Sequence, residues 1–284
     1  MRNPDETIVY FNGQFLPKKD VHISPDDRGF LFGDGVYEVV RAYDGRLFEA
    51  EAHFERLARS LKALRFPGPD VSVFGDVAQR LMRDNDLRDA ALYIQITRGA
   101  APRRHAFPGP DTPPTVYATV YAPQTSRQKW DEGVRAILVP DMRWARCDIK
   151  TIALPPNVLA SQRAAEAGVE EALLVRDGVL IEGSHTNVCA VIEGTLYTYP
   201  KTPQILPGIT RQVVLELCGQ LGIPYREEAV FEDQLDRVEE LMILGTTTEV
   251  MPVVEVDQRR IGDGRPGPVT RRLQQAYRQR ACPD

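Results

Sequence analysis

The chain has 284 residues, a formal net charge of −5, 43% hydrophobic residues and 26% charged residues. This length allows one large or two modest domains, and the composition is ordinary for a soluble globular protein. The acidic balance argues against a dedicated nucleic-acid binder, because such a protein usually presents a basic surface.

No apolar run approaches the roughly 18 residues of a membrane span, and residues 1–6 lack an apolar targeting segment. We therefore expect a cytoplasmic protein that does not bind membranes, with free thiols and no metal centre. The cysteines behind this expectation lack the paired spacing of metal ligands; they are Cys147, Cys189, Cys218 and Cys282.

Residues 8–48 are predicted to form strands and turns. Asn12-Gly13 and Asp44-Gly45 each separate two apolar runs, and such pairs tolerate the positive φ angles of a hairpin turn. Between them, Gly33-Asp34-Gly35 resembles a nucleotide-binding loop. The third glycine of that loop would stand at position 38, which is Glu38, so a dinucleotide fold is not favoured.

An amphipathic helix is predicted over residues 51–65, where apolar side chains recur every three and four residues. Arg56 lies off this apolar stripe, and spacing alone favours a solvated arginine there. A second helix is expected over about 73–85, followed by strands over 91–97 and 115–120.

A loop rich in proline and glycine, residues 99–114, joins these two strands and carries Arg103, Arg104 and His105. Loops on a rigid scaffold often carry binding residues. A histidine in a loop is nevertheless more often solvated than functional.

Residues 121–132 show no periodicity and are the predicted linker. We therefore expect two domains, residues 1–120 and residues 133–284. Beyond the linker, a helix is expected from Pro156, and Asp177-Gly178 and Glu193-Gly194 predict two more hairpins, so the fold class is α+β.

A later helix is expected to have Thr210 as its N-cap and Gly222 as its end. Helix N-termini attract phosphates because their first amides lack partners within the helix. A buried strand over 241–244 leads into a hydroxyl-rich turn, residues 245–249, and a final helix is expected over about 267–280.

Lys150 follows the run Ala136-Ile137-Leu138-Val139, which is typical of a buried strand. A lysine in an apolar strand can have its amine pKa lowered by desolvation and can form a Schiff base with a carbonyl. The alternative is a solvated surface lysine, because most lysines are exposed. The scarcity of lysine relative to arginine in this chain favours a functional role.

Lys150, the carboxylate of Glu182 and two turns suited to phosphate together form a possible site. An aldehyde cofactor with a phosphate and a pyridine ring would use all of them, the lysine as its covalent partner and the carboxylate to keep the ring nitrogen protonated. Spacing alone also allows Glu182 to be a surface carboxylate beside a glycine turn.

A series of motifs occurs in one order along the chain: Asp27-Arg28-Gly29, Phe32-Gly33-Asp34-Gly35-Val36-Tyr37-Glu38, His53 with Arg56-Leu57, Thr97-Arg98-Gly99, Pro102-Arg103-Arg104-His105, Arg143-Trp144, Arg146-Cys147-Asp148-Ile149-Lys150, Asn157-Val158-Leu159-Ala160, Glu182-Gly183-Ser184, Asn187-Val188, Gly208-Ile209-Thr210-Arg211 and Thr246-Thr247-Thr248-Glu249. In this series the sequence resembles the fold-type IV pyridoxal-phosphate enzymes, most closely the bacterial D-amino acid aminotransferases, from about Tyr10 to Gln275. The resemblance implies a two-domain α+β fold and pyridoxal 5′-phosphate as the cofactor.

The resemblance also implies roles for individual residues. Lys150 matches the Schiff-base lysine, which moves a proton between the substrate Cα and the C4′ carbon of the cofactor, and the C-terminal domain is expected to carry it. Glu182 matches the partner of the pyridine nitrogen, and Arg56 matches the phosphate-binding arginine. The remaining matches to cofactor-binding residues are Leu206 against the ring, Ile209 and Thr210 at a helix N-terminus, and Thr246 and Thr247 in a second phosphate turn.

Three matches concern the substrate α-carboxylate, namely Tyr37, Arg103 and His105. An arginine suits a carboxylate because its fork donates two parallel hydrogen bonds. The family places the arginine–histidine loop over the active site of the other subunit, so a homodimer is implied. Branched-chain aminotransferases share most cofactor residues but are not expected to show this Arg-x-His pair.

The sequence departs from the family pattern at four places. Gly245 replaces a hydroxyl residue of a phosphate turn, His185 interrupts a Ser/Thr-rich stretch, Arg104 adds charge, and Pro155-Pro156 stiffens the approach to a helix. These departures bear on substrate range and rate.

We therefore expect a transaminase that moves the amino group of D-alanine or a similar D-amino acid to 2-oxoglutarate or pyruvate. The alternatives are a transaminase of branched-chain L-amino acids or amines, an aminodeoxychorismate-type lyase, and a non-enzymatic binding protein. Lys150 and Glu182 argue against the last of these.

Overall fold

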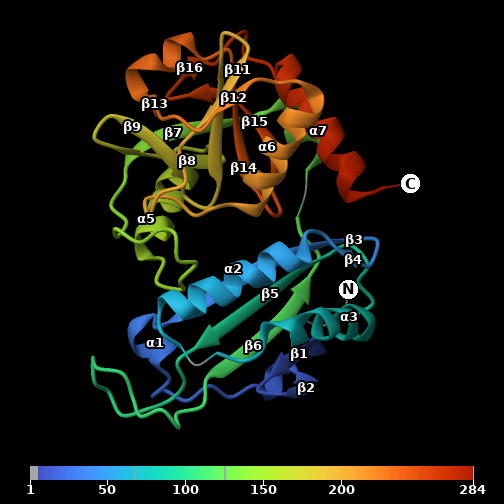
Figure 1. Ribbon diagram of the computed structural model, residues 1–284, viewed down its shortest axis with the longest axis vertical. Helices are drawn as coiled ribbons and strands as arrows, with labels where there is room; N and C mark the ends of the chain where they lie inside the picture. Colours follow the sequence, from blue (N-terminus) through green and yellow to red (C-terminus); the bar gives the residue numbers. More distant parts are fainter. Residues whose placement is uncertain (1–5, 67, 125, 284) are drawn as a thin grey trace. The chain divides into compact units, whose positions relative to one another are not determined.

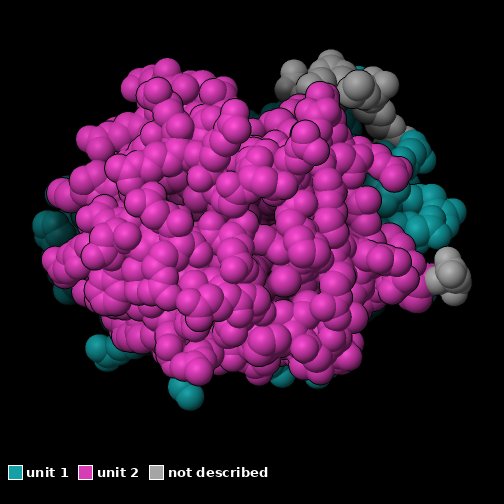
Figure 2. Space-filling model, turned by 90° about the horizontal axis from the view of Figure 1, so that it is seen from above, with its two compact units in different colours: residues 1–123, 149–153 teal, residues 124–148, 154–284 magenta. Residues whose placement is uncertain are grey.

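The computed structural model describes residues 6–66, 68–124 and 126–283 (Figure 1). The expectation that residues 1–6 contain no targeting segment concerns residues that, apart from Glu6, lie outside the described part of the chain. The described residues form two compact units: unit 1 comprises residues 1–123 and 149–153, and unit 2 comprises residues 124–148 and 154–284 (Figure 2). Each unit has its own sheet and core, as expected for a two-domain α+β protein.

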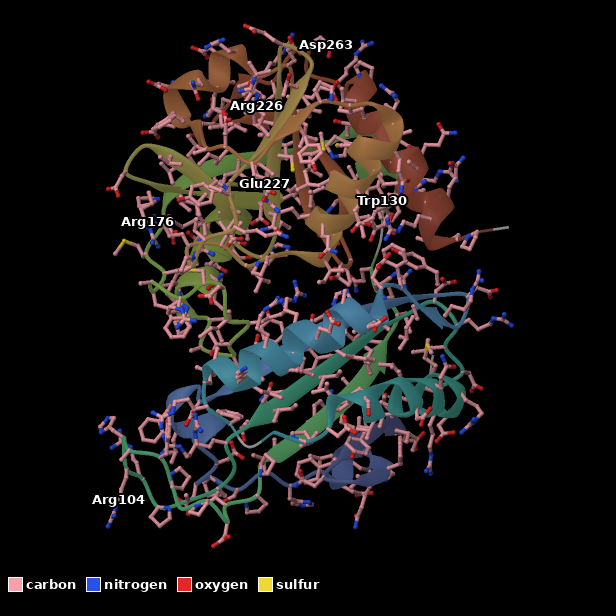
Figure 3. All side chains as sticks on the ribbon, viewed as in Figure 1. Arg104, Trp130, Arg176, Arg226, Glu227 and Asp263 are labelled. Carbon is pink, nitrogen blue, oxygen red and sulfur yellow. The ribbon has the colours of Figure 1, made fainter. Side chains whose placement is uncertain are left out.

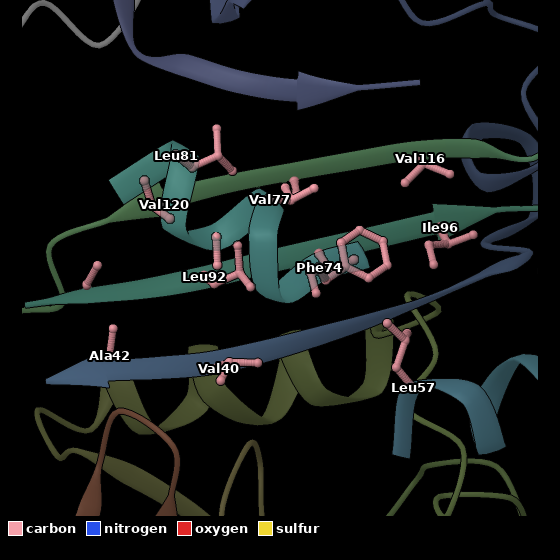
Figure 4. Close-up of a cluster of buried hydrophobic side chains, with 14 of the residues drawn as sticks. Val40, Ala42, Leu57, Phe74, Val77, Leu81, Leu92, Ile96, Val116 and Val120 are labelled. Carbon is pink, nitrogen blue, oxygen red and sulfur yellow. The ribbon is translucent and has the colours of Figure 1, made fainter. Parts of the chain in front are cut away.

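Unit 1 contains a six-stranded antiparallel sheet in the order β2-β1-β6-β5-β3-β4. The helices α2 (Ala50–Ala63) and α3 (Phe74–Asp84) contribute to its core, and the fully buried Phe74 of α3 belongs to the same hydrophobic cluster as Leu57 of α2 and Val40 of the sheet (Figure 4). The strands are β1 (Ile8–Phe11), β2 (Gln14–Pro17), β3 (Gly35–Tyr43), β4 (Arg46–Leu47), β5 (Ala90–Thr97) and β6 (Thr115–Tyr121), and the 3₁₀ helices are η2 (Lys18–Asp20) and η3 (Val71–Val73).

A short helix, α1 (Arg28–Phe32), lies within the segment that was predicted to contain only strands and turns. The side chain of Asp27 accepts a hydrogen bond from the Gly29 amide (2.8 Å), and Gly33 ends the helix with a φ of 66°. Five residues are too few to show a helical apolar period, which is why the sequence pattern missed α1.

Unit 2 contains a mixed sheet in the order β12-β11-β10-β14-β15-β7-β8-β9-β13, with β16 paired to β15. The central β7 pairs in parallel with both β15 and β8, and the hairpins pair antiparallel. The strands are β7 (Val134–Pro140), β8 (Glu171–Arg176), β9 (Val179–Gly183), β10 (Asn187–Ile192), β11 (Thr195–Thr198), β12 (Tyr225–Arg226), β13 (Val230–Phe231), β14 (Glu240–Gly245), β15 (Glu249–Val256) and β16 (Arg259–Arg260); the helices are α4 (Arg127–Glu132), α5 (Pro155–Glu166), α6 (Ile209–Leu221), η4 (Glu232–Arg237) and α7 (Pro268–Ala281).

The four predicted hairpins are confirmed by the strand register. The flanking pairs are Phe11 with Gln14, Tyr43 with Arg46, Arg176 with Val179, and Ile192 with Thr195. The first turn residues, such as Asn12 at 46° and Asp177 at 53°, adopt the positive φ that these turns require.

The structure differs from the expected division of the chain at two points. Six residues of the expected linker, 127–132, form α4, which contacts β15. The segment 149–153, which includes Lys150, belongs to unit 1 rather than to the C-terminal domain. The reason is backbone pairing: Ile152 N donates to Gly35 O (3.1 Å), and Thr151 forms a bridge with Val36 of β3.

In the part of the chain that the structure describes, every helix is too short or too polar to cross a membrane.

Candidate active site

Lys150 lies in an irregular segment and not in a strand as the sequence predicted, since β7 ends at Pro140. Its backbone is held by two hydrogen bonds, from Lys150 N to Ser60 Oγ (3.3 Å) and from Tyr37 N to Lys150 O (3.0 Å). The side chain is half-buried, and Nζ lies 4.3 Å from the centroid of the Tyr37 ring. Unit 1 therefore presents a lysine amine against an aromatic face.

Arg56 is only 2% exposed, which contradicts the solvated arginine that its spacing favoured. Its guanidinium forms a two-pronged ion pair with Glu38, with Nε–Oε2 at 2.9 Å and Nη2–Oε1 at 2.7 Å. Nδ1 of His53 lies 3.0 Å from the same Glu38 Oε1. This pairing across the α2–β3 contact fixes the direction of the Arg56 side chain.

The buried carboxylate of Glu38 is stabilised by the positive charge of Arg56. Burial would raise the pKa of Glu38, but the charges of Arg56 and His53 outweigh it and hold the pKa far below its usual range. Burial lowers the pKa of His53, although Glu38 opposes the shift. Glu38 is therefore an anion at neutral pH, and its ion pair with Arg56 persists.

The three predicted carboxylate-binding residues, Tyr37, Arg103 and His105, all belong to unit 1. Within one chain only Arg103 and His105 lie close together. Arg103 and His105 stand on the exposed loop between β5 and β6, and both contact the ring of Phe32 of α1: the Arg103 Cζ is 5.1 Å from its centroid, and the His105 ring is 5.4 Å from it. Tyr37 instead contacts Lys150 and Tyr93.

Glu182, on β9 of unit 2, is buried, which rules out the surface carboxylate that spacing alone allowed. One carboxylate oxygen accepts from Nη1 of Arg143, and the other accepts from Nδ2 of Asn187 (2.8 Å) and from the Leu206 amide (3.2 Å). Burial raises the pKa of Glu182 to about 7, with the charge of Arg143 opposing the shift. The group therefore changes charge near neutral pH.

Arg143 links Glu182 to a second carboxylate. Its guanidinium also binds both oxygens of Asp141, at 2.9 and 3.0 Å, and Asp141 in turn accepts from Arg176 (2.9 Å). Burial would lower the pKa of Arg143, but its bonds to Asp141 and Glu182 outweigh this effect and raise it. The motif Arg143-Trp144 gives no sign of this contact with Glu182, which lies 39 residues further along the chain.

The first turn of α6 contains the predicted residues Ile209 and Thr210, both buried. The N-cap is Gly208 and not Thr210, and only glycine fits at position 208, where a Cβ would lie 1.9 Å from Oδ1 of Asn187. No side chain caps this helix. The amides of its first turn also have no acceptor within the helix, because helix geometry leaves the first amides unpaired. Gly222 ends α6 with a φ of 64°, as predicted.

Thr246 and Thr247 lie in the turn between β14 and β15, which Gly245 and Glu249 close as a pair. Nε1 of Trp130, on α4, donates to the carbonyl of Thr248 (2.9 Å) and holds the turn from outside. Gly245 leaves room where a Cβ would come within 3.3 Å of the Thr248 hydroxyl.

His185 does not enter these clusters. Its side chain is 60% exposed, and Nδ1 lies 3.2 Å from Oε2 of Glu171. Glu171 is fully buried and accepts from the hydroxyls of Ser184 (2.5 Å) and Thr186 (2.8 Å), which fixes the turn after Glu182.

Each unit offers its own set of chemical groups. Unit 1 provides an amine, an oriented arginine and a cationic loop. Unit 2 provides a buried carboxylate, helix amides and a hydroxyl-rich turn, which suit a phosphate-bearing nitrogen heterocycle. Among the described residues, no cluster of three or more histidine, cysteine, aspartate or glutamate side chains is arranged to hold a metal ion.

Besides Arg143, two further residues that hold predicted site residues were not singled out from the sequence, namely Glu38 for Arg56 and Asn187 for Glu182. Glu38 faces the core on a strand whose alternation calls for an apolar residue. A glutamate at such a position indicates a buried ion pair and could have drawn attention to Arg56.

Comparisons with known proteins agree with this chemistry. The family model described as "Amino-transferase class IV" matches residues 35–256. The chain is similar to the D-alanine aminotransferase of Bacillus licheniformis, with 42% identity over 94% of this chain and 95% of that one. It is also similar to the D-alanine aminotransferase of Staphylococcus haemolyticus, with 40% identity over 95% of this chain and 96% of that one.

Solved structures also match over nearly the whole chain. A branched-chain amino acid aminotransferase of Escherichia coli has a TM-score of 0.91 at 27% identity and covers 96% of this chain and 93% of its own. The branched-chain aminotransferase of the archaeon Thermoproteus uzoniensis, solved with norvaline, has a TM-score of 0.84 at 26% identity, covering 96% and 94%. The family and fold expected from the motifs are confirmed, and the chain belongs to the class IV aminotransferases.

Proposed function

We propose that this protein is a pyridoxal-phosphate-dependent transaminase of D-amino acids. The observation that carries the proposal is a pair of groups, the half-buried amine of Lys150 and the buried carboxylate of Glu182, on a chain about 40% identical to D-alanine aminotransferases over 95% of its length. We propose that residues of both units act on the same cofactor molecule.

The residues present fit this cofactor. Glu182 is buried, accepts from Asn187 and the Leu206 amide, and has a pKa raised to about 7, so it can share a proton with a pyridine nitrogen. Gly208 leaves the first turn of α6 without a side-chain cap, and such a turn binds phosphate through its amides.

When bound, pyridoxal phosphate supplies an aldehyde that joins the substrate nitrogen and a ring that takes up electrons from Cα. Lys150 would hold the cofactor through its aldehyde, and its free amine would move a proton at the substrate Cα. Glu182 would keep the ring nitrogen protonated, and Leu206 would pack on the ring. Arg56, the helix start at Ile209 and Thr210, and the turn at Thr246 and Thr247 would hold the phosphate.

For the substrate, we propose that Tyr37, Arg103 and His105 bind the α-carboxylate. An arginine fork with a neighbouring imidazole donates several hydrogen bonds to a planar anion. The donor is D-alanine or another small or acidic D-amino acid, and the acceptor is 2-oxoglutarate or pyruvate.

We further propose a homodimer with the active site at the subunit interface. One chain brings Arg103 and His105 together on Phe32 but leaves Tyr37 against Lys150 and Tyr93, which supports a loop that serves a partner's site. We also propose a cytoplasmic location, which the free thiols of Cys147, Cys189, Cys218 and Cys282 support.

The test is a transamination assay with D-alanine and 2-oxoglutarate, in which pyruvate and the chirality of the glutamate formed are both measured. We expect D-glutamate and pyruvate in equal amounts, and a loss of roughly 10⁴-fold or more in Lys150→Ala.

Two rival reactions are tested by measuring the products formed from other substrates. Turnover of L-leucine but not D-alanine would replace the proposal with a branched-chain activity, to which the solved structures at 27% and 26% identity point. Pyruvate release from an aminodeoxychorismate-like substrate without any 2-oxo acid would indicate a lyase.

A further inference from the structure

Arg28, the first residue of α1, is bound to the backbone of the loop that carries Arg103 and His105. Its Nη1 donates to the carbonyls of Arg104 (2.5 Å) and Ala106 (3.4 Å), and its Nη2 donates to the carbonyl of His105 (3.4 Å). These carbonyls are 76 to 78 residues away along the chain. Arg28 thus holds three consecutive peptide groups at the part of the loop predicted to bind the substrate.

The position of Arg28 is itself fixed. The side chain is 4% exposed, and its Nε donates to Oδ2 of Asp34 at 2.8 Å. Asp34 also binds Arg98 through both of its oxygens, at 2.8 and 3.1 Å. A buried arginine whose Nε is engaged by a carboxylate presents its Nη groups in one direction, here toward the loop carbonyls.

Phe32, at the other end of α1, contacts the side chains of the same loop. Its ring lies 4.8 Å from the Cζ of Arg28 and 5.1 Å from the Cζ of Arg103, and 5.4 Å from the ring of His105. The aromatic face therefore gathers one guanidinium and one imidazole from the loop while the Arg28 guanidinium holds its backbone.

Arg104, between these two residues, behaves differently. Its side chain is exposed and points away from the ribbon (Figure 3), while its carbonyl is the acceptor nearest to Arg28. The Arg104 side chain thus differs in direction from those of Arg103 and His105, which both contact the Phe32 ring.

We propose that α1 positions the carboxylate-binding loop, with Arg28 fixing its backbone and Phe32 aligning Arg103 and His105. Arg28 and Phe32 are then positioning residues that determine the affinity for the substrate α-carboxylate without contacting it. The part of this inference that concerns the substrate rests on the proposed function; the part that concerns the loop does not.

The test uses two variants and a matched control. Arg28→Lys keeps the charge but cannot reach Asp34 and three carbonyls at once, because an ammonium lacks the guanidinium fork. Phe32→Leu keeps an apolar residue but removes the aromatic face. Phe30→Leu makes the same change on the same helix at a side chain that is 77% exposed.

The first measurement needs no substrate. Trypsin cleaves after Arg103 and Arg104, and the second of these cuts uses the carbonyl that Arg28 holds. In Arg28→Lys we expect native-state cleavage at this loop to be about tenfold faster, since proteolysis follows the opening of the bound segment. Phe32→Leu should show a smaller increase and Phe30→Leu none.

The second measurement is the steady-state kinetics of D-alanine with saturating cofactor. For Arg28→Lys and Phe32→Leu we expect the KM to rise about tenfold while kcat changes by less than about threefold, because carboxylate binding is lost and the proton transfer is not. A general loss of stability would not separate KM from kcat in this way.

The outcomes distinguish the anchoring of the loop by α1 from the role of Arg103 and His105 in carboxylate binding. Faster cleavage with a higher KM supports the inference. Faster cleavage with an unchanged KM would keep α1 as the anchor of the loop but overturn the carboxylate role given to Arg103 and His105. Unchanged cleavage in Arg28→Lys, or equal acceleration in Phe30→Leu, would overturn the inference.

Discussion

The carboxylate of Glu182 in unit 2 and the loop of Arg103 and His105 in unit 1 are held in opposite ways. Glu182 is 4% exposed, and three neighbours donate to its own oxygens. Arg103 and His105 are exposed, and the hydrogen bonds that Arg28 donates near them bind the loop backbone instead. One functional group is fixed through its charge, and the other two are fixed through the chain that carries them.

This difference follows from the chemistry expected of each place. A carboxylate that controls a ring proton must have a defined pKa, which requires burial and specified partners. A group that binds a soluble anion must remain accessible and keep its donors free, so its orientation has to come from neighbours that do not use those donors. We therefore expect changes at Glu182 to act on kcat and changes at the loop to act on KM.

Glu182→Gln is expected to have the largest effect of the changes that separate the two regions. An amide cannot keep the ring nitrogen protonated, so kcat should fall by about 10²-fold or more with little change in KM. Steady-state kinetics with D-alanine at saturating cofactor measures both constants. Glu228→Gln, at an exposed glutamate of the same unit, is the control and should leave both unchanged.

The same variant tests the raised pKa of Glu182. A carboxyl whose pKa rises from 4.5 to about 7 on folding holds its proton more tightly in the folded state. Its stabilising contribution is therefore present below about pH 4.5 and is lost as the pH rises through about 7. The Tm of the cofactor-free protein should fall more steeply between pH 5 and 7.5 than that of Glu182→Gln; parallel curves would exclude the raised pKa.

Arg103→Lys is expected to have an intermediate effect, confined to binding. Lysine keeps the charge but loses the two parallel hydrogen bonds, so the KM for D-alanine should rise about tenfold with kcat nearly constant. Arg104→Lys makes the same change one residue along, at a side chain that points to solvent, and should change KM by less than twofold. Equal effects of the two variants would mean that the loop contributes only general positive charge.

Glu38→Gln should have the smallest effect on turnover and a clear effect on stability. The change leaves the buried Arg56 without its anion, and breaking such a pair costs about 3–5 kcal/mol of unfolding free energy. With the guanidinium no longer oriented, the affinity for pyridoxal phosphate should fall about tenfold, while kcat at saturating cofactor stays within about twofold. A normal affinity would show that Glu38 supports the core and does not position Arg56.

The sequence predicted the local features well because they depend on neighbouring residues. The hairpin at Asp177-Gly178 and the end of α6 at Gly222 need only a residue that accepts a positive φ. The motif series likewise identified the family from about Tyr10 to Gln275, and the family model over residues 35–256 agrees with it.

The missed features depend on contacts between distant residues. Arg56 is buried by Glu38, 18 residues earlier, and Arg28 binds carbonyls 76 or more residues later. The N-cap of α6 is Gly208 rather than Thr210, at a position where Oδ1 of Asn187 leaves no room for a Cβ. Lys150 joins unit 1 through backbone bonds to β3 that no periodicity reveals.

The central claim, that Lys150 and the Tyr37–Arg103–His105 set make a D-amino acid site with pyridoxal phosphate, is tested most directly by absorbance. The purified protein is loaded with the cofactor and mixed with D-alanine and, separately, with L-leucine, in both cases without an acceptor. We predict a visible band that D-alanine converts to the pyridoxamine spectrum and that L-leucine leaves unchanged. Conversion by L-leucine alone would contradict the D-amino acid site, and the absence of a visible band after loading would contradict the role of Lys150.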